Sequence, residues 1–250
     1  MSQLLNLELY KFLLVFLRIG AAIMLMPGFL TSYVNAKLRL SIALAISVIL
    51  MPIIGEKLQI PGTFAPALGF LLSEITYGIF IGIFMQILFS ALNLAGNIAG
   101  QSIGFSNAQM FDPAFQQQSI IIDTFLSITA LTVIFITDLH HLMLSAVIDS
   151  YTLFPAGSPL PVEDFAQSIG KTFNQSFIMG FKLGSPFIAF SIVFYVGMGL
   201  VSRLMPQLNI FFLSLPLQIY LGLGLLFITI PVIILWFTRF YENGLFQFVK

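Results

Sequence analysis

Residues 75–111 carry no charged side chain. A helix needs about 20 mostly apolar residues to cross a bilayer, so this stretch is too long for one span. Residues 96–118, which begin within this stretch and extend beyond it, combine glycines and amide side chains with bulky apolar residues, and a charge returns only at Asp112. Uncharged polar backbone is stable at membrane depth only when it is buried in protein or lines a water-filled cavity. The stretch therefore predicts a pore-facing segment between long membrane helices.

The composition supports an integral membrane protein. Hydrophobic residues make up 58% of the 250 residues and charged residues 8%, whereas soluble proteins average about 25% charged residues. The formal net charge is zero, which gives no reason to expect a nucleic acid partner. The chain has no cysteine, which excludes disulfides, thiolate metal sites and cysteine catalysis. Because a basic leader is missing, we expect the first apolar run to be a retained span and not a signal peptide.

Six apolar segments approach the length of a membrane span, and all predict helices because strand-type alternation is missing. They cover about residues 9–29, 38–54, a third segment from about 66, then 119–148, 173–201 and 212–240. Residues 149–171 contain three prolines and two adjacent acids, which predicts an exposed connection and the main internal boundary. Prolines in the last two spans predict kinked helices: Pro186, Pro206, Pro216 and Pro231. The expected fold is an all-α membrane protein.

Glycines recur four residues apart in two places on the third segment. This spacing places them on one helix face, where they allow a neighbouring backbone to approach closely. The residues concerned are Gly78, Gly82, Gly96 and Gly100, followed by Gly104. We interpret them as helix-packing positions. The alternative is that they form a tight interface with partner subunits.

Residues 104–118 alternate soft apolar side chains with neutral amides. Such a loop can close a pore by excluding water, and methionine deforms easily enough to suit a seal. Asp112 and Pro113 together are typical of a turn. The alternative is a re-entrant or interfacial loop without a gating role.

Ionisable residues inside apolar segments are functional candidates by default. They are Arg18, Glu74, Asp123, Asp138 and Lys182. They are scattered singly, and the sequence leaves open whether they pair structurally or relay protons. It does not identify the partner of Arg18.

No catalytic or cofactor motif is present. His140 and His141 are adjacent, so on a regular helix they point about 100° apart and cannot share a metal in the usual manner. Metalloprotease, nucleophile-elbow and P-loop signatures are also missing. We expect no enzyme activity, no cofactor and no metal site.

Three segments resemble the FliR family, whose injectisome members are called SctT. GNIAGQSIGFSNAQMFDP resembles its run of small residues, a G-x-S turn and Asp-Pro. GMGLVSRLMPQLNIFFLSLPLQI is similar to the second family signature, and LFPAGSP is similar to the stretch that follows the fourth span. The resemblance covers nearly the whole chain.

The resemblance implies a subunit of the flagellar type III secretion export gate in the bacterial inner membrane, at the flagellar basal body. It implies a helical hetero-oligomeric assembly with FliP and FliQ, contacts with FlhB and FlhA, and membrane lipid around the complex. Residues 1–160 would be FliP-like and residues 161–250 a FliQ-like helical hairpin. The cargo would be unfolded flagellar proteins.

The resemblance also assigns site residues. It implies that a plug in the pore is formed by Gly104, Phe105, Ser106, Asn107, Met110, Phe111, Asp112 and Pro113. It implies that the tip of the hairpin, with Arg203, Pro206 and Gln207, faces the cytoplasmic entrance. Two other functions remain open: an injectisome export gate subunit, or a small-solute or proton-coupled secondary transporter that uses Glu74 or Lys182.

Overall fold

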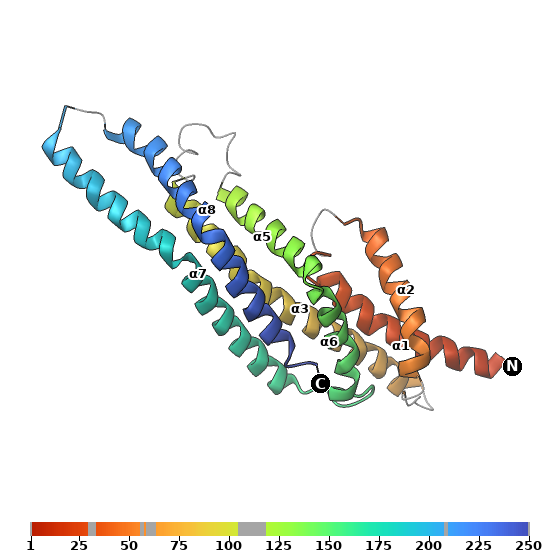
Figure 1. Cartoon of the computed structure of the whole chain (residues 1–250). Coiled ribbons are helices and arrows are strands. Elements are labelled where there is room, and N and C mark those ends of the chain that lie inside the picture. The colour runs from red at the N-terminus through yellow and green to blue at the C-terminus, as the bar shows by residue number, and fades with distance from the viewer. Residues whose placement is uncertain are drawn as a thin grey trace. The chain divides into compact units, whose positions relative to one another are not determined.

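A computed structural model describes residues 2–29, 34–55, 58, 64–104, 119–207 and 210–249. These residues form helices and no strand, so the predicted all-α fold is confirmed for them (Figure 1). The helices are α1 (Ser2–Leu25), α2 (Ala36–Gly55), α3 (Phe64–Ile103), α5 (Ser119–Ile136), α6 (Leu139–Leu153), α7 (Val162–Leu204) and α8 (Ile210–Leu245).

Four of the described helices are long and apolar enough to cross a membrane: α2, α3, α7 and α8. A fifth span results if α5 and α6 count as one broken span. Helix α1, which the sequence predicted to be a span, is not among them. It carries Glu8, Lys11 and Arg18 close together. The protein is therefore an all-α membrane protein, and its described residues contain four or five candidate spans, where the sequence predicted six.

Two predicted boundaries are corrected. The fourth segment is broken at Asp138, which has a left-handed backbone (φ 59°) between α5 and α6. The predicted exposed connection of residues 149–171 is much shorter, because α6 continues to Leu153 and α7 already begins at Val162. The reason is the acid pair Glu163 and Asp164, which lies in the first turn of α7. Acidic side chains there are stabilised by the helix dipole.

Three of the four prolines expected within helices are found there. Pro186 lies inside α7, and Pro216 and Pro231 lie inside α8. Pro206 is a correction, because α7 ends at Leu204 and Pro206 lies in the turn that follows. Proline lacks the backbone N–H that would continue a helix and clashes with the preceding turn.

The two longest described helices are far longer than a membrane needs. Helix α3 has 40 residues and α7 has 43. At 1.5 Å per residue these correspond to about 60 and 65 Å. The hydrocarbon core of a bilayer is only about 30 Å thick, so lipid tails alone cannot surround either helix along its whole length.

The described chain divides into two compact units. Unit 1 comprises Met1–Leu88, Asp138–Phe173 and Glu242–Lys250; unit 2 comprises Phe89–Thr137 and Asn174–Tyr241. Each unit therefore contains residues from both sides of residue 160. The predicted division at that point concerns likeness to two kinds of partner subunit, which the two units do not test, and it stays a prediction.

Aromatic side chains dominate the core of unit 1. Phe80 of α3 stacks on Phe165 of α7 with ring centroids 3.8 Å apart, and Phe84 meets Phe248 edge to face at 4.7 Å. Phe154, in the connection between α6 and α7, stacks on Tyr77 at 5.3 Å. Such ring pairs add stability beyond the area that they bury. They hold the connection between α6 and α7 against α3.

In unit 2, α7 lies close against α3 because its glycines leave no side chain between the two helices. A Cβ atom added at Gly180 would lie 2.6 Å from the carbonyl oxygen of Ala91, and one at Gly184 would lie 2.9 Å from Ile98. Close approach through small residues is a common way for membrane helices to pack.

Candidate functional site

Most of the predicted plug lies outside the described residues. This applies to Phe105, Ser106, Asn107, Met110, Phe111, Asp112 and Pro113. Gly104 is described and marks the end of α3, with a φ of 94° that favours glycine. Its N–H donates to the carbonyl of Gln101 at 3.1 Å. Helix α3 therefore ends where the predicted plug begins.

Gln218 of α8 contacts this end of α3. It is only 2% exposed, and its Nε2 donates to the carbonyl oxygen of Ser102 at 2.9 Å. The same amide lies 3.3 Å from the Tyr195 hydroxyl on α7. The sequence analysis did not single out Gln218. The available signal was that Gln218 is the only amide side chain in the predicted span 212–240.

A second polar contact in unit 2 joins α3 to α5. A Cβ atom at Gly96 would lie 2.6 Å from the Cα atom of Asp123, so the two helices touch there. One turn away, the Ser127 hydroxyl donates to Asn93 Oδ1 at 2.9 Å and also lies 3.5 Å from an Asp123 carboxylate oxygen. Gly100 is buried on the same helix.

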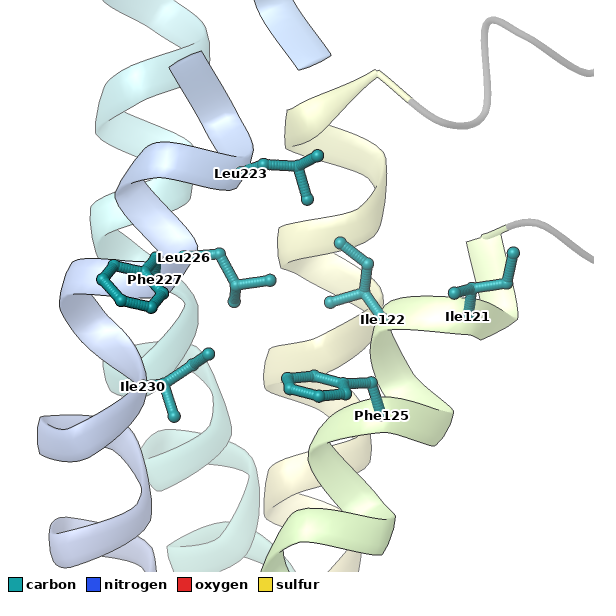
Figure 2. A pocket seen from close by; sticks show the side chains of 7 residues that line it. All are labelled: Ile121, Ile122, Phe125, Leu223, Leu226, Phe227 and Ile230. Carbon is teal, nitrogen blue, oxygen red and sulfur yellow. The ribbon is translucent and has the colours of Figure 1, made fainter. Parts of the chain in front are cut away.

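A groove of about 310 Å³ lies between α5 and α8 in unit 2 (Figure 2). The described residues that line it are all Ile, Leu or Phe: Ile121, Ile122, Phe125, Leu223, Leu226, Phe227 and Ile230. Phe227 is 80% exposed. Because the described lining contains no polar side chain, the groove suits hydrocarbon and not a polar solute.

Unit 1 contains a buried ion pair that the sequence left unassigned. Arg18 of α1 and Glu74 of α3 are both fully buried. Nε of Arg18 donates to Glu74 Oε2 at 2.6 Å, and Nη2 donates to Oε1 at 2.9 Å. This two-point geometry is the strongest form of the arginine–carboxylate interaction.

Arg18 makes two further hydrogen bonds. Nη1 donates to the Ser150 hydroxyl at 3.3 Å, and Nη2 donates to the carbonyl of Phe154 at 3.0 Å. The guanidinium lies 3.9 Å from the ring centre of Tyr151 and 4.6 Å from that of Tyr77. Cation–π contacts of this kind stabilise a desolvated charge. One side chain thus links α1, α3, α6 and the connection after α6.

Two of the predicted glycines explain how Arg18 reaches Glu74. Gly78 and Gly82 follow Glu74 at intervals of four residues on one face of α3. A Cβ atom at Gly78 would collide with the carbonyl oxygen of Arg18, and one at Gly82 would lie 2.6 Å from Leu25 Cβ. Glycine at both positions therefore allows α1 to approach α3 within the reach of the ion pair.

The predicted hairpin tip is exposed. Arg203 lies in the last turn of α7, where a positive charge complements the helix dipole. Pro206 and Gln207 are exposed in the turn that follows. Leu204, which lies among them, is 80% exposed. The tip thus combines one cation with apolar surface.

Asp138, His140 and His141 gather at the break between α5 and α6. Their potential ligand atoms lie within 4.8 Å of one another, and His141 Nδ1 lies 3.4 Å from Asp138 Oδ1. Both histidines lie in the first turn of α6, as on the regular helix expected from the sequence, and Asp138 at the break brings a third potential ligand atom beside them. The Asp138 and His141 side chains are 76% and 69% exposed. Such exposed groups are common without a metal, and the arrangement alone assigns none.

Known proteins similar to this chain act in export. Residues 9–244 match the family described as Bacterial export proteins, family 1. The chain is 38% identical over 237 residues to the flagellar biosynthetic protein FliR of Caulobacter vibrioides, and the similarity covers 94% of each protein. It is 31% identical over 227 residues to the FliR of Bacillus subtilis, covering 89% of this chain and 86% of that protein. Yop proteins translocation protein T of Yersinia pestis is 26% identical over 117 residues, covering 46% and 45%.

Proposed function

Because this chain belongs to the FliR family of bacterial export proteins, we propose that it is a subunit of the flagellar type III secretion export gate. Membership makes it a membrane component of flagellar protein export. The finer proposal is that it forms, with FliP and FliQ, the channel through which unfolded flagellar proteins leave the cell. FlhB and FlhA would contact this gate in the inner membrane, at the flagellar basal body.

The observation that carries the proposal is the uncovered apolar surface of α7. Only 6% of the residues in its most apolar 18-residue stretch are buried within the chain. Val193 is 72% exposed and Leu204 is 80% exposed. A helix of about 65 Å is twice the thickness of the hydrocarbon core. Apolar surface beyond the bilayer needs cover from protein, which supports a hetero-oligomer with FliP and FliQ.

The pore-closing role concerns residues 104–118. Its support is the end of α3 at Gly104, held by Gln218, together with the methionine-containing sequence that follows, which is uncharged up to Phe111. A segment with soft apolar side chains excludes water and ions from a narrow pore. We therefore retain the plug as part of the proposed function. The hairpin tip at Arg203 would face FlhB or a neighbouring subunit.

The secondary transporter is the weaker alternative. Its coupling carboxylate would be Glu74, and this carboxylate is bound at both oxygens by Arg18. A group held in this way is poorly suited to binding and releasing protons or ions during a cycle. The described groove in unit 2 is also purely apolar, unlike a midplane site for a polar solute.

The injectisome alternative is also less well supported. The flagellar relatives match nearly the whole chain, whereas the injectisome relative matches less than half of it.

The export role requires no chemistry from this chain, and the sequence contains no nucleotide-binding motif. We propose that energy for export comes from partner proteins and that the chain is not an enzyme.

Co-expression with FliP and FliQ, followed by native mass spectrometry in detergent, tests the proposal. We expect the three proteins to co-purify as one complex. Val193→Lys should reduce this complex severalfold, because a desolvated cation on the apolar α7 surface is costly. Gln175→Lys, at an already polar exposed position of α7, is the matched control. A chain that purifies alone or only with copies of itself would refute the export-gate assignment.

A further inference from the structure

The end of α3 is held by a contact from α8 that differs from the surrounding apolar packing. Ser102 and Ile103 form the last turn of α3, and both are buried. The last carbonyl groups of a helix have no partner within the helix and must find one elsewhere. Gln218 supplies such a partner, since its amide donates to the carbonyl of Ser102 at 2.9 Å.

The neighbouring contacts leave little freedom at this junction. The Gln218 amide atoms lie 3.0–3.2 Å from the position of a Cβ atom on Gly104. One turn further along α8, a Cβ atom on Gly222 would lie 2.8 Å from Ile103. Gln218 and Gly222 are four residues apart and share one face of α8. The final turn of α3 and the Gly104 backbone pack against this face.

A buried amide within a membrane helix is costly unless its hydrogen bonds are satisfied. Packing alone would be served as well by leucine or methionine at position 218. The glutamine donates to the end of α3 and also lies 3.3 Å from the Tyr195 hydroxyl on α7. It therefore joins one end of α3 to both helices of the last hairpin, all within unit 2.

We infer that Gln218 is a positioning residue of the export gate. It fixes the end of α3 to the α7–α8 hairpin, so that the chain leaves α3 at Gly104 in one defined direction. The inference rests on the proposed function, because that direction matters only if residues 104–118 close the pore. Its structural part, the hold on α3, can be measured independently of the pore.

The absence of cysteine allows a direct test on the assembled complex. Ser102→Cys places a nearly isosteric thiol in the buried last turn of α3, and Gln101→Cys places one at the neighbouring exposed position. We expect Gln218→Met to raise the rate of maleimide labelling of the thiol at position 102 about tenfold, as loss of one buried hydrogen bond implies. Methionine keeps the shape of the side chain but cannot donate. Labelling of the thiol at position 101 should stay unchanged.

A pH profile separates positioning by the hydrogen bond from mere packing. In Gln218→Glu, the protonated acid can donate to the Ser102 carbonyl, whereas the ionised form can only accept. Tyr195 is the titratable group that faces this position. Labelling at position 102, relative to position 101, should rise between about pH 6 and pH 9 in Gln218→Glu. It should stay flat in Gln218→Met and in the chain that keeps Gln218.

The pore is assayed separately, by ion leakage through the assembled gate in cells. Gln218→Met should leak without loss of assembly. If its labelling and leakage match those of the chain with Gln218 while Met110→Ala with Phe111→Ala does leak, the inference about Gln218 is wrong. If that plug double variant does not leak, the pore-closing role of residues 104–118 is wrong. In that case, labelling of the thiol at position 102 still decides whether Gln218 holds α3.

Discussion

At the scale of single residues, Arg18 stands out as the largest fully buried side chain among the described residues. Its guanidinium is fully buried, and its contacts comprise a carboxylate, a hydroxyl, a backbone carbonyl and two aromatic rings. Burying a charge costs several kcal/mol, and these ion-pair, hydrogen-bond and cation–π contacts offset this cost. We therefore interpret the pair as a structural contact that holds α1 against α3 in unit 1, and not as a mobile proton carrier.

Replacing one member of the Arg18–Glu74 pair should destabilise the folded chain far more than replacing both. Glu74→Gln leaves the arginine charge buried without a counter-charge and should destabilise the chain by about 3–5 kcal/mol. The double variant Arg18→Met with Glu74→Met should be closer to the unsubstituted chain. Thermal unfolding in detergent measures both. Glu8→Gln, which breaks the exposed pair with Lys11, is the control and should cost at most about 1 kcal/mol. Equal losses of thermal stability in Glu74→Gln and Glu8→Gln would contradict a structural role of the Arg18–Glu74 pair.

Two glycines of α3 form a matched pair for testing backbone contact. A Cβ atom at Gly78 collides with the carbonyl of Arg18, whereas nothing lies within 4 Å of one at Gly69. Gly78→Ala should destabilise by about 1–3 kcal/mol through overpacking. Gly69→Ala should be neutral or stabilise by up to about 1 kcal/mol, since alanine favours helix. The melting temperatures of the two variants, measured side by side, test this difference. An unchanged melting temperature of Gly78→Ala would argue against close packing of α1 on α3.

At the scale of helices, α7 and α8 leave much apolar surface uncovered within the described chain, since only 6% and 22% of the residues in their most apolar stretches are buried. Tyr220, Phe227 and Ile228 of α8 are each more than 70% exposed. The α7–α8 hairpin ends in Arg203 and a proline turn, which are also exposed. The exposed apolar sides of this hairpin suit contact with partner subunits, and its cationic tip suits contact with a further protein.

The charge of the tip can be reversed without disturbing a buried contact. Arg203→Glu places an anion at the negative end of the α7 dipole and removes the cation offered to a partner. We expect motility in soft agar to fall severalfold, whereas Arg203→Lys should keep most of it. The loss from the dipole alone is about 0.3–1 kcal/mol, too little to unfold a long helix. Wild-type motility of Arg203→Glu would show that the tip has no role in export.

At the scale of the whole molecule, the central question is whether the chain closes a pore. Combining Met110→Ala with Phe111→Ala shrinks two bulky side chains of the proposed plug. We expect the assembled gate to leak small solutes, because a smaller apolar constriction holds water out less well. Phe246→Ala, at an exposed site near the end of α8, is the control. A correctly assembled double variant that remains tight would refute the plug.

The fold class and most helix positions could be predicted from composition and from runs of apolar residues. The errors occurred where a short-range signal had two meanings. Glu163 and Asp164 predicted an exposed loop, yet acids equally favour the first turn of a helix. Pro206 predicted a kink within a helix, yet proline equally ends one. The resemblance carried the family assignment, which the comparisons confirm.

By itself, the sequence determined that this is an all-α membrane protein of the FliR family, because apolar length and local motifs are written along the chain. Only the tertiary structure decided which distant groups meet. Arg18 and Glu74 are 56 residues apart, and Gln218 and Ser102 are 116 apart. No periodicity links such positions. The pairing follows from which glycine faces let two helices approach, and therefore from the packing of the folded chain.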